Sequence, residues 1–443
     1  MRGPSSSVAR ATGGVTAVPL LVLFALNLVD EFDRVAFGVL SPEIRDAFGL
    51  SDSGIVAVGS LAGVTALLAA LPVGILADRV RRVRLSAVGA AAWGGFTVLT
   101  ALAPAVWVLT VARIGAGVGR IVNEPVHASL LTDYYPPASH PRVFALHRLA
   151  NPIGLGSALV VGALASVFDW RVVFAALCVP TFLLLPVLLR LREPDRGESV
   201  DARAARAAAA SRRPTFLEAR RTLFAVPTLR RLWLGLPVVG IALIALPQLI
   251  SLFFEREYAY GPTGRGVVTF LSGVGIVLGL ALGQRLATRA LAAGRPELLA
   301  TYDGTSIAAI GVALLALVLS PWAEVSAACY LLAGIGVGCY QPNYFSLVAL
   351  VSPPRVRAQA YAWAILWLGV GALVAPLLAG IGESSGYRLA IGVLAVTLLL
   401  GGVVAASARR AVRADAEAAH AELAAASAAA EPEPGPDPVP AQT

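Results

Sequence analysis

Long apolar stretches, each about as long as a membrane-spanning helix, recur along the whole chain. A hydrocarbon core of about 30 Å needs roughly 20 apolar residues per helix. Such stretches lie near 17–41, 53–77, 85–104, 106–132, 142–166 and 171–190, and a second set lies near 231–253, 264–286, 298–319, 322–350, 358–381 and 386–408. The pattern predicts an all-α membrane protein with twelve transmembrane helices in two bundles of six.

Polar segments separate and flank the two sets of apolar stretches. We expect residues 1–16 to form a cytoplasmic N-terminus, and 17–190 and 231–408 to form the two six-helix bundles. Residues 191–230 are rich in arginine and alanine and too charged to span, which predicts a cytoplasmic linker with a short amphipathic helix around 216–224. The Ala/Glu/Pro-rich segment 409–443 is predicted to be a disordered cytoplasmic tail that begins as a frayed helix.

The distribution of positive charge predicts the orientation. All 35 basic residues are arginine; 11 of them lie between 190 and 231, and only five lie in the loops at the opposite ends of the predicted helices. Positive charge concentrates on the cytoplasmic side of membrane proteins, so both termini should be cytoplasmic. The arginine and alanine bias suggests a GC-rich genome, and we expect a multi-pass monomer in a bacterial inner membrane.

Composition excludes several classes of protein. The chain is 57% hydrophobic and only 14% charged, whereas soluble proteins are about a quarter charged. It has no nucleotide-binding fingerprint, no metal-spaced cluster and no nucleophile elbow, and its three cysteines lie in apolar stretches. We therefore expect no enzyme activity, cofactor, metal or nucleic-acid partner, and expect the partners to be a small-molecule substrate, protons and the lipid bilayer.

The two predicted bundles resemble each other in sequence. GAGVG followed by Glu124-Pro125 in the first half corresponds to GIGVG followed by Gln341-Pro342 in the second, and the two dipeptides are 217 residues apart. A duplicated helical unit is typical of secondary transporters that work by alternating access, with the substrate path between the halves.

The turn after the second apolar stretch reads GILADRVRRVR, from Gly74 to Arg84. It resembles the signature loop of the major facilitator superfamily, and the resemblance implies that family's fold of two pseudo-symmetric six-helix bundles. In that family the loop latches one conformation. The resemblance therefore assigns a gating role to four residues, Gly74, Asp78, Arg79 and Arg82.

A narrower resemblance covers roughly residues 27–197. Asp33-Arg34, the signature loop, RIGAGVG from Arg113 and ANPIG from Ala150 resemble the Spinster branch of the superfamily. This implies proton-linked movement of amphiphilic molecules such as lysolipids or hydrophobic drugs. Spinster proteins carry a glutamate directly after the GVG of helix four, whereas this chain has Arg120, and its nearest acid is Glu124.

Charged residues inside the predicted helices of the first half are the candidate coupling residues. A charge in mid-membrane costs roughly 2.5–3.5 kcal/mol, so such residues must pair or face water. Helical spacing places them in stripes on helices one and four. We predict Asp33 and Glu124 to be coupling carboxylates with Arg34, Arg113 and Arg120 as exchanging partners. Fixed salt bridges that pack helices together are the alternative. Secondary candidates for the cavity are Asp30, Glu31, Arg148 and Asn151.

The second half shows no charge at comparable depth, and its candidate substrate contacts are polar or aromatic: Gln248, Tyr340, Gln341, Asn343, Tyr344 and Trp367. Proton-coupled efflux of amphiphilic or drug-like molecules is the leading hypothesis. Import of a small organic anion held by the helix-four arginines is the alternative within transporters, because the cavity charges give no clear net sign. A non-transporting sensor or scaffold is the alternative from another class.

Overall fold

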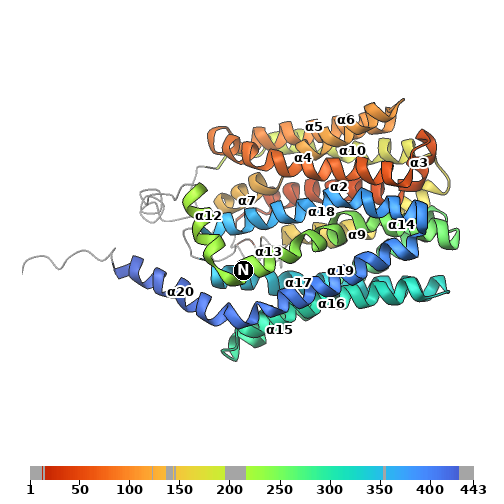
Figure 1. Cartoon of the computed structure of the whole chain (residues 1–443). Helices are drawn as coiled ribbons and strands as arrows, with labels where there is room; N and C mark the ends of the chain where they lie inside the picture. The colour runs from red at the N-terminus through yellow and green to blue at the C-terminus, as the bar shows by residue number, and fades with distance from the viewer. Residues whose placement is uncertain are drawn as a thin grey trace, which may run out of the picture.

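A computed structural model describes residues 12, 15–121, 123–135, 143, 146–194, 216–352 and 356–428 of the 443-residue chain. Every regular element in these ranges is a helix. The long helices run side by side along one axis (Figure 1), with α3 (Ser41–Phe48) at one end and α12 (Phe216–Ala225) and α20 (Arg409–Ala428) at the other. We call these the α3 end and the α12 end.

The first half contains the elements that correspond to the first six apolar stretches. They are α2 (Val18–Val39), α4 (Asp52–Arg79), α5 (Arg82–Leu102), α6 (Val106–Ile121) with α7 (Asn123–Tyr134), α9 (Ala150–Ala165) and α10 (Trp170–Leu189).

The second half repeats the arrangement. Its first span runs through α13 (Pro227–Gly240), a five-residue π-helical segment η2 (Ile241–Ala245) and α14 (Leu246–Tyr258). The others are α15 (Pro262–Ala292), α16 (Glu297–Leu319), α17 (Ala323–Val351), α18 (Arg357–Ser385) and α19 (Tyr387–Ser407).

Within the described ranges, nine helices are long and apolar enough to cross a membrane. The other three predicted spans correspond to α2, α4 and the α6–α7 pair. Helix α2 holds four charged residues between 30 and 34, which lowers its hydropathy.

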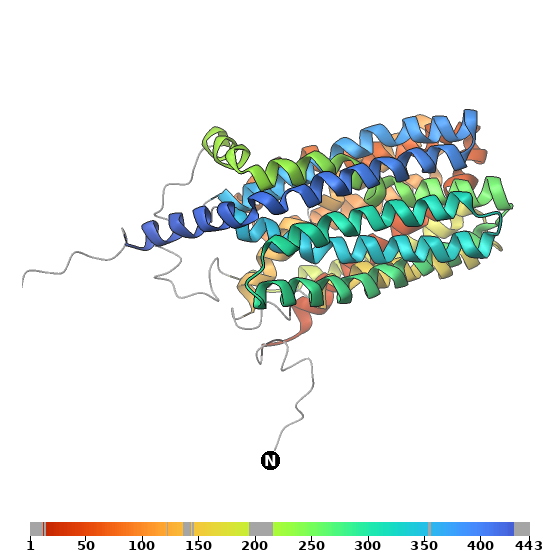
Figure 2. The same ribbon diagram turned by 60° about the horizontal axis from the view of Figure 1, so that its bottom comes forward.

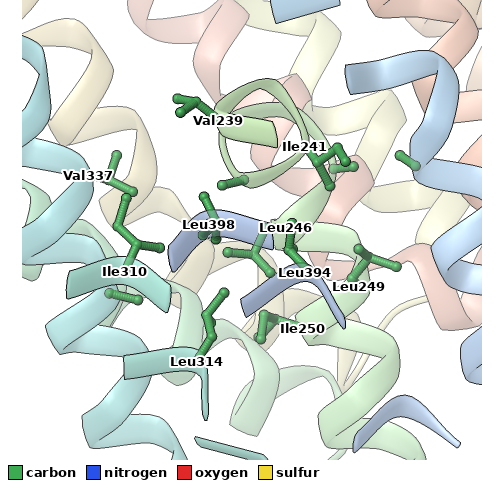
Figure 3. Packing of buried hydrophobic residues seen from close by; sticks show 14 of the residues in the cluster. Val239, Ile241, Leu246, Leu249, Ile250, Ile310, Leu314, Val337, Leu394 and Leu398 are labelled. Atoms are coloured by element: carbon green, nitrogen blue, oxygen red, sulfur yellow. The ribbon is translucent and has the colours of Figure 1, made fainter. Parts of the chain in front are cut away.

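Glycines let the helices of the second half approach closely. Side chains at Gly275, Gly279 and Gly283 of α15 would place a Cβ 2.1–2.5 Å from carbonyl oxygens of α17, so only glycine fits at these three positions. Buried aliphatic side chains from α13, η2, α14, α16, α17 and α19 then fill the middle of this half (Figure 3).

The two halves contact each other toward the α3 end. Helix α9 packs on α15, where a Cβ at Gly266 would lie 2.3 Å from Ala158 O and one at Gly162 would lie 2.6 Å from Pro262 O. Helix α4 packs on α18 and approaches α14, where Gln248 lies against Gly59.

Ion pairs reinforce this contact. Arg45 of α3 binds both carboxylate oxygens of Glu255 in α14, at 3.0 and 3.1 Å, and Asp52 of α4 at 2.7 Å. Arg256 lies 3.2 Å from Asp52. We call these four residues the interhalf latch. Burial lowers the pKa of Arg45, but the hydrogen bonds to the acids outweigh it and raise that pKa above its usual value.

The linker and tail are described only in part. Residues 195–215 and 429–443 and most of 1–14 lie outside the described ranges. The amphipathic helix predicted around 216–224 is α12. The tail predicted at 409–443, a frayed helix followed by disorder, is helical at 409–428, which form α20 (Figure 2). This segment is rich in alanine, a strong helix former, and Val412 is buried while Arg413 pairs with Glu297.

Candidate functional site

Asp33 is the centre of a buried ion-pair cluster between α2 and α6. Its carboxylate lies 3.1 Å from the guanidinium of Arg113 and 3.1 Å from that of Arg120, and it accepts a hydrogen bond of 3.3 Å from Thr97 of α5. The side chain is 1% exposed. The facing stripes predicted on helices one and four therefore do meet.

Two neighbours on α2 extend the cluster. Asp30, one turn before Asp33, lies 2.5 Å from Nε of Arg120, and Glu31 lies 2.5 Å from Arg34. Arg113 also lies over the ring of Phe37, 4.4 Å from its centroid. We call this set the acid–arginine network: Asp30, Glu31, Asp33, Arg34, Arg113 and Arg120.

Glycines position the helices that carry the network. A Cβ at Gly154 of α9 would lie 2.3 Å from Cβ of Glu31, so α9 can approach α2 closely only with glycine there. A Cβ at Gly119 of α6 would lie 2.7 Å from the backbone nitrogen of Trp93. This close α5–α6 packing holds Arg120, the next residue, against α2.

The acids and the arginines of the network differ in exposure. The side chains of Asp30, Glu31 and Asp33 are only 8%, 9% and 1% exposed. Arg34 and Arg120 are 45% and 23% exposed. The most solvent-accessible side chains of the network are therefore those of the positively charged Arg34 and Arg120, whereas its three acids are buried.

A second polar chain runs from the network toward the α12 end. Asn27, one turn before Asp30, donates to Asn151 Oδ1 (3.3 Å) and to the carbonyl of His147 (3.4 Å). Nδ1 of His127 lies 3.3 Å from Nε2 of His147, and Nε2 of His127 lies 3.0 Å from the hydroxyl of Ser86. Asn151 is thus linked to the site by its hydrogen bond with Asn27 of α2.

Other predicted coupling and gating residues lie apart from the network or outside the described side chains. The side chain of Arg148 is exposed at the start of the α9 region. The side chains of Glu124, Gly74, Asp78 and Arg79 are outside the described set. Their predicted roles stay predictions.

Arg82, the last residue of the predicted gating loop, is 2% exposed. It pairs with Asp133 of α7 and, at 3.3 Å, with Glu193, and it donates to the carbonyl of Pro194 at 2.8 Å. It therefore ties the start of α5 to the end of α7 and to the segment that leaves the first half.

The predicted substrate contacts of the second half differ in burial. Gln248, Tyr340, Asn343 and Tyr344 are buried, and the two tyrosine rings stack at 5.3 Å. The partly exposed members of the predicted set are Gln341 and Trp367. Substrate contact by these residues remains a prediction.

The second half contains a buried acid that the sequence analysis did not single out. Asp303 of α16 is 1% exposed, and neither of its carboxylate oxygens has a hydrogen-bond partner among the described residues. It lies in YDGTS near the start of a predicted span, where an acid is typical of the membrane boundary. The position of Asp303 in the sequence does not indicate that α17 and α19 bury it.

Comparison with known proteins identifies the family. A sequence model of the Major Facilitator Superfamily matches residues 23–323 and 303–431. The chain belongs to this superfamily. It is therefore an all-α membrane transporter protein and not an enzyme.

Two bacterial relatives align with most of the chain. It is 26% identical to the gentisate transporter of Corynebacterium glutamicum, over 82% of this chain and 80% of the relative. It is 28% identical to the 3-(3-hydroxy-phenyl)propionate transporter of Escherichia coli, over 92% and 93% of the respective chains.

Part of the chain is also similar to Spinster proteins. It is 27% identical over 189 residues to spinster homolog 1 of Xenopus laevis, which is 41% of this chain and 36% of that protein. A solved bacterial homolog of the human lysosomal transporter Spinster, inward-facing and unoccupied, superposes with a TM-score of 0.76 at 21% identity, covering 93% of this chain and 99% of that one. The fold is that of the superfamily.

Proposed function

We propose that the protein is a secondary transporter that moves a small organic anion, of the aromatic-acid type, together with protons. The observation that carries this proposal is that Arg34 is exposed and Arg120 partly exposed, whereas the acids with which they pair are buried. The sequence alone left the net sign of the predicted cavity open, and this difference in exposure favours a positive one.

An exposed arginine in a transmembrane segment requires a polar neighbour. A charge facing lipid costs several kcal/mol, so Arg34 and Arg120 are expected to face water or a ligand. Guanidinium groups bind carboxylates through two parallel hydrogen bonds. Two accessible arginines are therefore well suited to hold the carboxylate of an organic acid, which is ionised at neutral pH.

The same network supports proton coupling. Asp33 shares one of its two arginines, Arg120, with Asp30, and an incoming carboxylate would compete for the same guanidinium group. A substrate that draws Arg120 away from Asp30 and Asp33 reduces the positive charge beside these acids, which favours proton uptake by them. A proton moving down the membrane potential supplies about 2.3 kcal/mol per 100 mV.

The relatives support this choice of substrate class. The two relatives that span most of the chain are named for gentisate and 3-(3-hydroxy-phenyl)propionate, both aromatic carboxylates. We extend only the class, a small aromatic acid, to this protein.

Efflux of amphiphilic or drug-like molecules is a second candidate. The similarity of part of the chain to Spinster proteins favours it, as does the stacked Tyr340–Tyr344 pair in the second half. It differs from the first candidate in substrate charge and in direction, so one transport assay separates the two.

The arginine distribution supports the remaining proposals about placement. We propose that the α12 end, next to the arginine-rich linker, faces the cytoplasm, with both termini on that side of a bacterial inner membrane. The interhalf latch then closes the outer side. A monomer holds the complete network, so we propose that it is the working unit.

Reconstitution tests the proposal. Purified protein in liposomes is assayed with labelled gentisate, 3-(3-hydroxyphenyl)propionate and a lysophospholipid, with and without an inward proton gradient. We expect gradient-driven accumulation of at least one aromatic acid and its loss in Arg120→Gln, with Glu324→Gln, at an exposed acid in the first turn of α17, as the control. Gradient-dependent movement of the lysophospholipid alone would instead support the second candidate.

A further inference from the structure

The second half contains a buried acid that the proposed mechanism does not use. Asp303 lies two turns into α16, is 1% exposed, and its two oxygens lack hydrogen-bond partners within the described residues. An isolated ionised carboxylate in an apolar interior is too costly to persist, and such a group becomes neutral or finds a partner. Asp303 therefore needs a physical explanation.

The packing of α16 on α17 places Asp303 beside two phenols. One turn further along α16, the carbonyl of Ser306 lies 3.1 Å from where Gly336 would carry a Cβ. The helices are antiparallel, so the next turn of α17 brings Tyr340 to the level of Asp303. Asp303 is close enough to act electrostatically on both Tyr340 and Tyr344, which are each 3% exposed.

The neighbouring polar side chains do not supply a partner to Asp303. The side chains of Tyr344 and Trp233 on α13 form a hydrogen bond with each other. Buried polar groups are nearly always hydrogen-bonded in proteins, so the two unpartnered carboxylate oxygens of Asp303 indicate internal water or a bound proton. This cluster is separate from the acid–arginine network, since it lies inside the second half.

No cation compensates Asp303 in the described ranges. Helix α19 packs beside it through backbone at Gly402, 2.3 Å from where Gly304 would carry a Cβ. On α20, Arg413 pairs with Glu297, and Asp415 accepts from the backbone of Thr228. On α13, Arg231 donates to the carbonyl of Ser407, and Arg230 is exposed. The remaining described charged residues at this end of α15 and α20 are exposed, namely Arg285, Arg289, Arg409, Arg410 and Glu417.

We propose that Asp303 is a proton-binding site of the second half, occupied by a proton in this conformation and lined by Tyr340 and Tyr344. Loss of the proton leaves an uncompensated charge between α16 and α17. The two helices must then separate enough to admit water, so occupancy of the site is linked to the packing of the second half. This inference does not depend on the identity of the transported substrate.

Thermal unfolding against pH tests the site without any substrate. The native state binds a proton at Asp303 that the unfolded chain, in which the acid is ionised in water, does not. Stability should therefore fall as pH rises, by up to about tenfold in the unfolding equilibrium constant per pH unit. Asp303→Asn should remove this part of the pH dependence, whereas Glu324→Gln, at an exposed acid of α17, should leave it unchanged. Equal pH dependence in wild type and Asp303→Asn would overturn the proposal.

Infrared spectroscopy provides a second measurement that needs only a conservative variant. The carbonyl stretch of a protonated carboxyl group should be present at neutral pH in the wild type and should shift in Asp303→Glu. A spectrum with no protonated carboxyl, or with one that Asp303→Glu does not alter, contradicts the proposal. Neither measurement involves transport, so a failure of the anion-transport proposal leaves both results interpretable.

Discussion

The two halves share a fold but differ in whether their buried acids are paired with arginine. In the first half, three acids and three arginines form a connected network, and Asp33 alone contacts two arginines. In the second half, Asp303 is buried without a cation or a hydrogen bond in the described ranges. A paired acid can stay ionised in a membrane protein, whereas an unpaired one is stable only when neutral.

This difference separates two kinds of proton site. In the network, a proton can be exchanged by moving an arginine, so an incoming anion can control it. At Asp303 only hydration or helix movement can release the proton. The first half is therefore suited to coupling with substrate, and the second half to sensing conformation.

Replacing Asp33, the central acid of the network, should have the largest effect on stability and transport. Asp33→Asn leaves Arg113 and Arg120 buried with less compensation, and loss of one partner of a buried ion pair costs about 3–5 kcal/mol. We expect a large fall in thermal stability and loss of transport, measured by thermal unfolding and liposome uptake. A stable variant with wild-type uptake would show that Asp33 is neither structural nor coupling.

The interhalf latch tests whether the two halves move relative to each other. Arg45→Gln removes the bidentate pair with Glu255 and one partner of the fully buried Asp52. A double-mutant cycle with Glu255→Gln should give a coupling energy of about 2 kcal/mol. Transport should change with it, because the closed α3 end is weakened. Additive effects of the two substitutions would mean that the pair contributes nothing.

Substitution of the two accessible arginines, Arg34 and Arg120, tests the proposed anion-binding site. Arg34→Gln and Arg120→Gln should each weaken anion binding by roughly tenfold, equivalent to about 1.4 kcal/mol for a lost charged contact. The measurement is the ligand-induced shift in melting temperature across anion concentrations. Unchanged affinity in both variants would mean that the anion does not bind at Arg34 and Arg120.

The smallest expected effect concerns the polar chain beside the network. Asn151→Ala removes one of the two acceptors of Asn27, whose other acceptor is the His147 carbonyl. We expect a loss of about 0.5–1 kcal/mol in unfolding free energy and little change in transport. Complete loss of transport in this variant would mean that the chain of asparagines and histidines carries the proton.

Local patterns made much of the fold predictable. Apolar length predicted the spans and helical spacing predicted the charged stripes at 30–34 and 113–120, because hydrophobicity and helical spacing are properties of the sequence itself. That the two stripes face each other was implied by the resemblance to the superfamily. The tail was expected to begin as a frayed helix, and its alanine-rich segment forms the 20-residue helix α20.

Properties set by tertiary packing could not be predicted. Which network members are exposed depends on how α2, α5, α6 and α9 pack, so the sequence left the sign of the cavity open. The latch joins Arg45 to Glu255 across 210 residues, and both looked like ordinary loop charges. Asp303 resembled a boundary residue because only the surrounding helices bury it.

The most direct test of the account follows protons and anion in one experiment. Proteoliposomes with an internal pH indicator are exposed to gentisate or 3-(3-hydroxyphenyl)propionate without an imposed gradient. We predict that anion entry acidifies the lumen in the wild type and that Asp33→Asn abolishes both the anion entry and the acidification. Anion entry with no pH change in the wild type, or coupled entry preserved in Asp33→Asn, would contradict it.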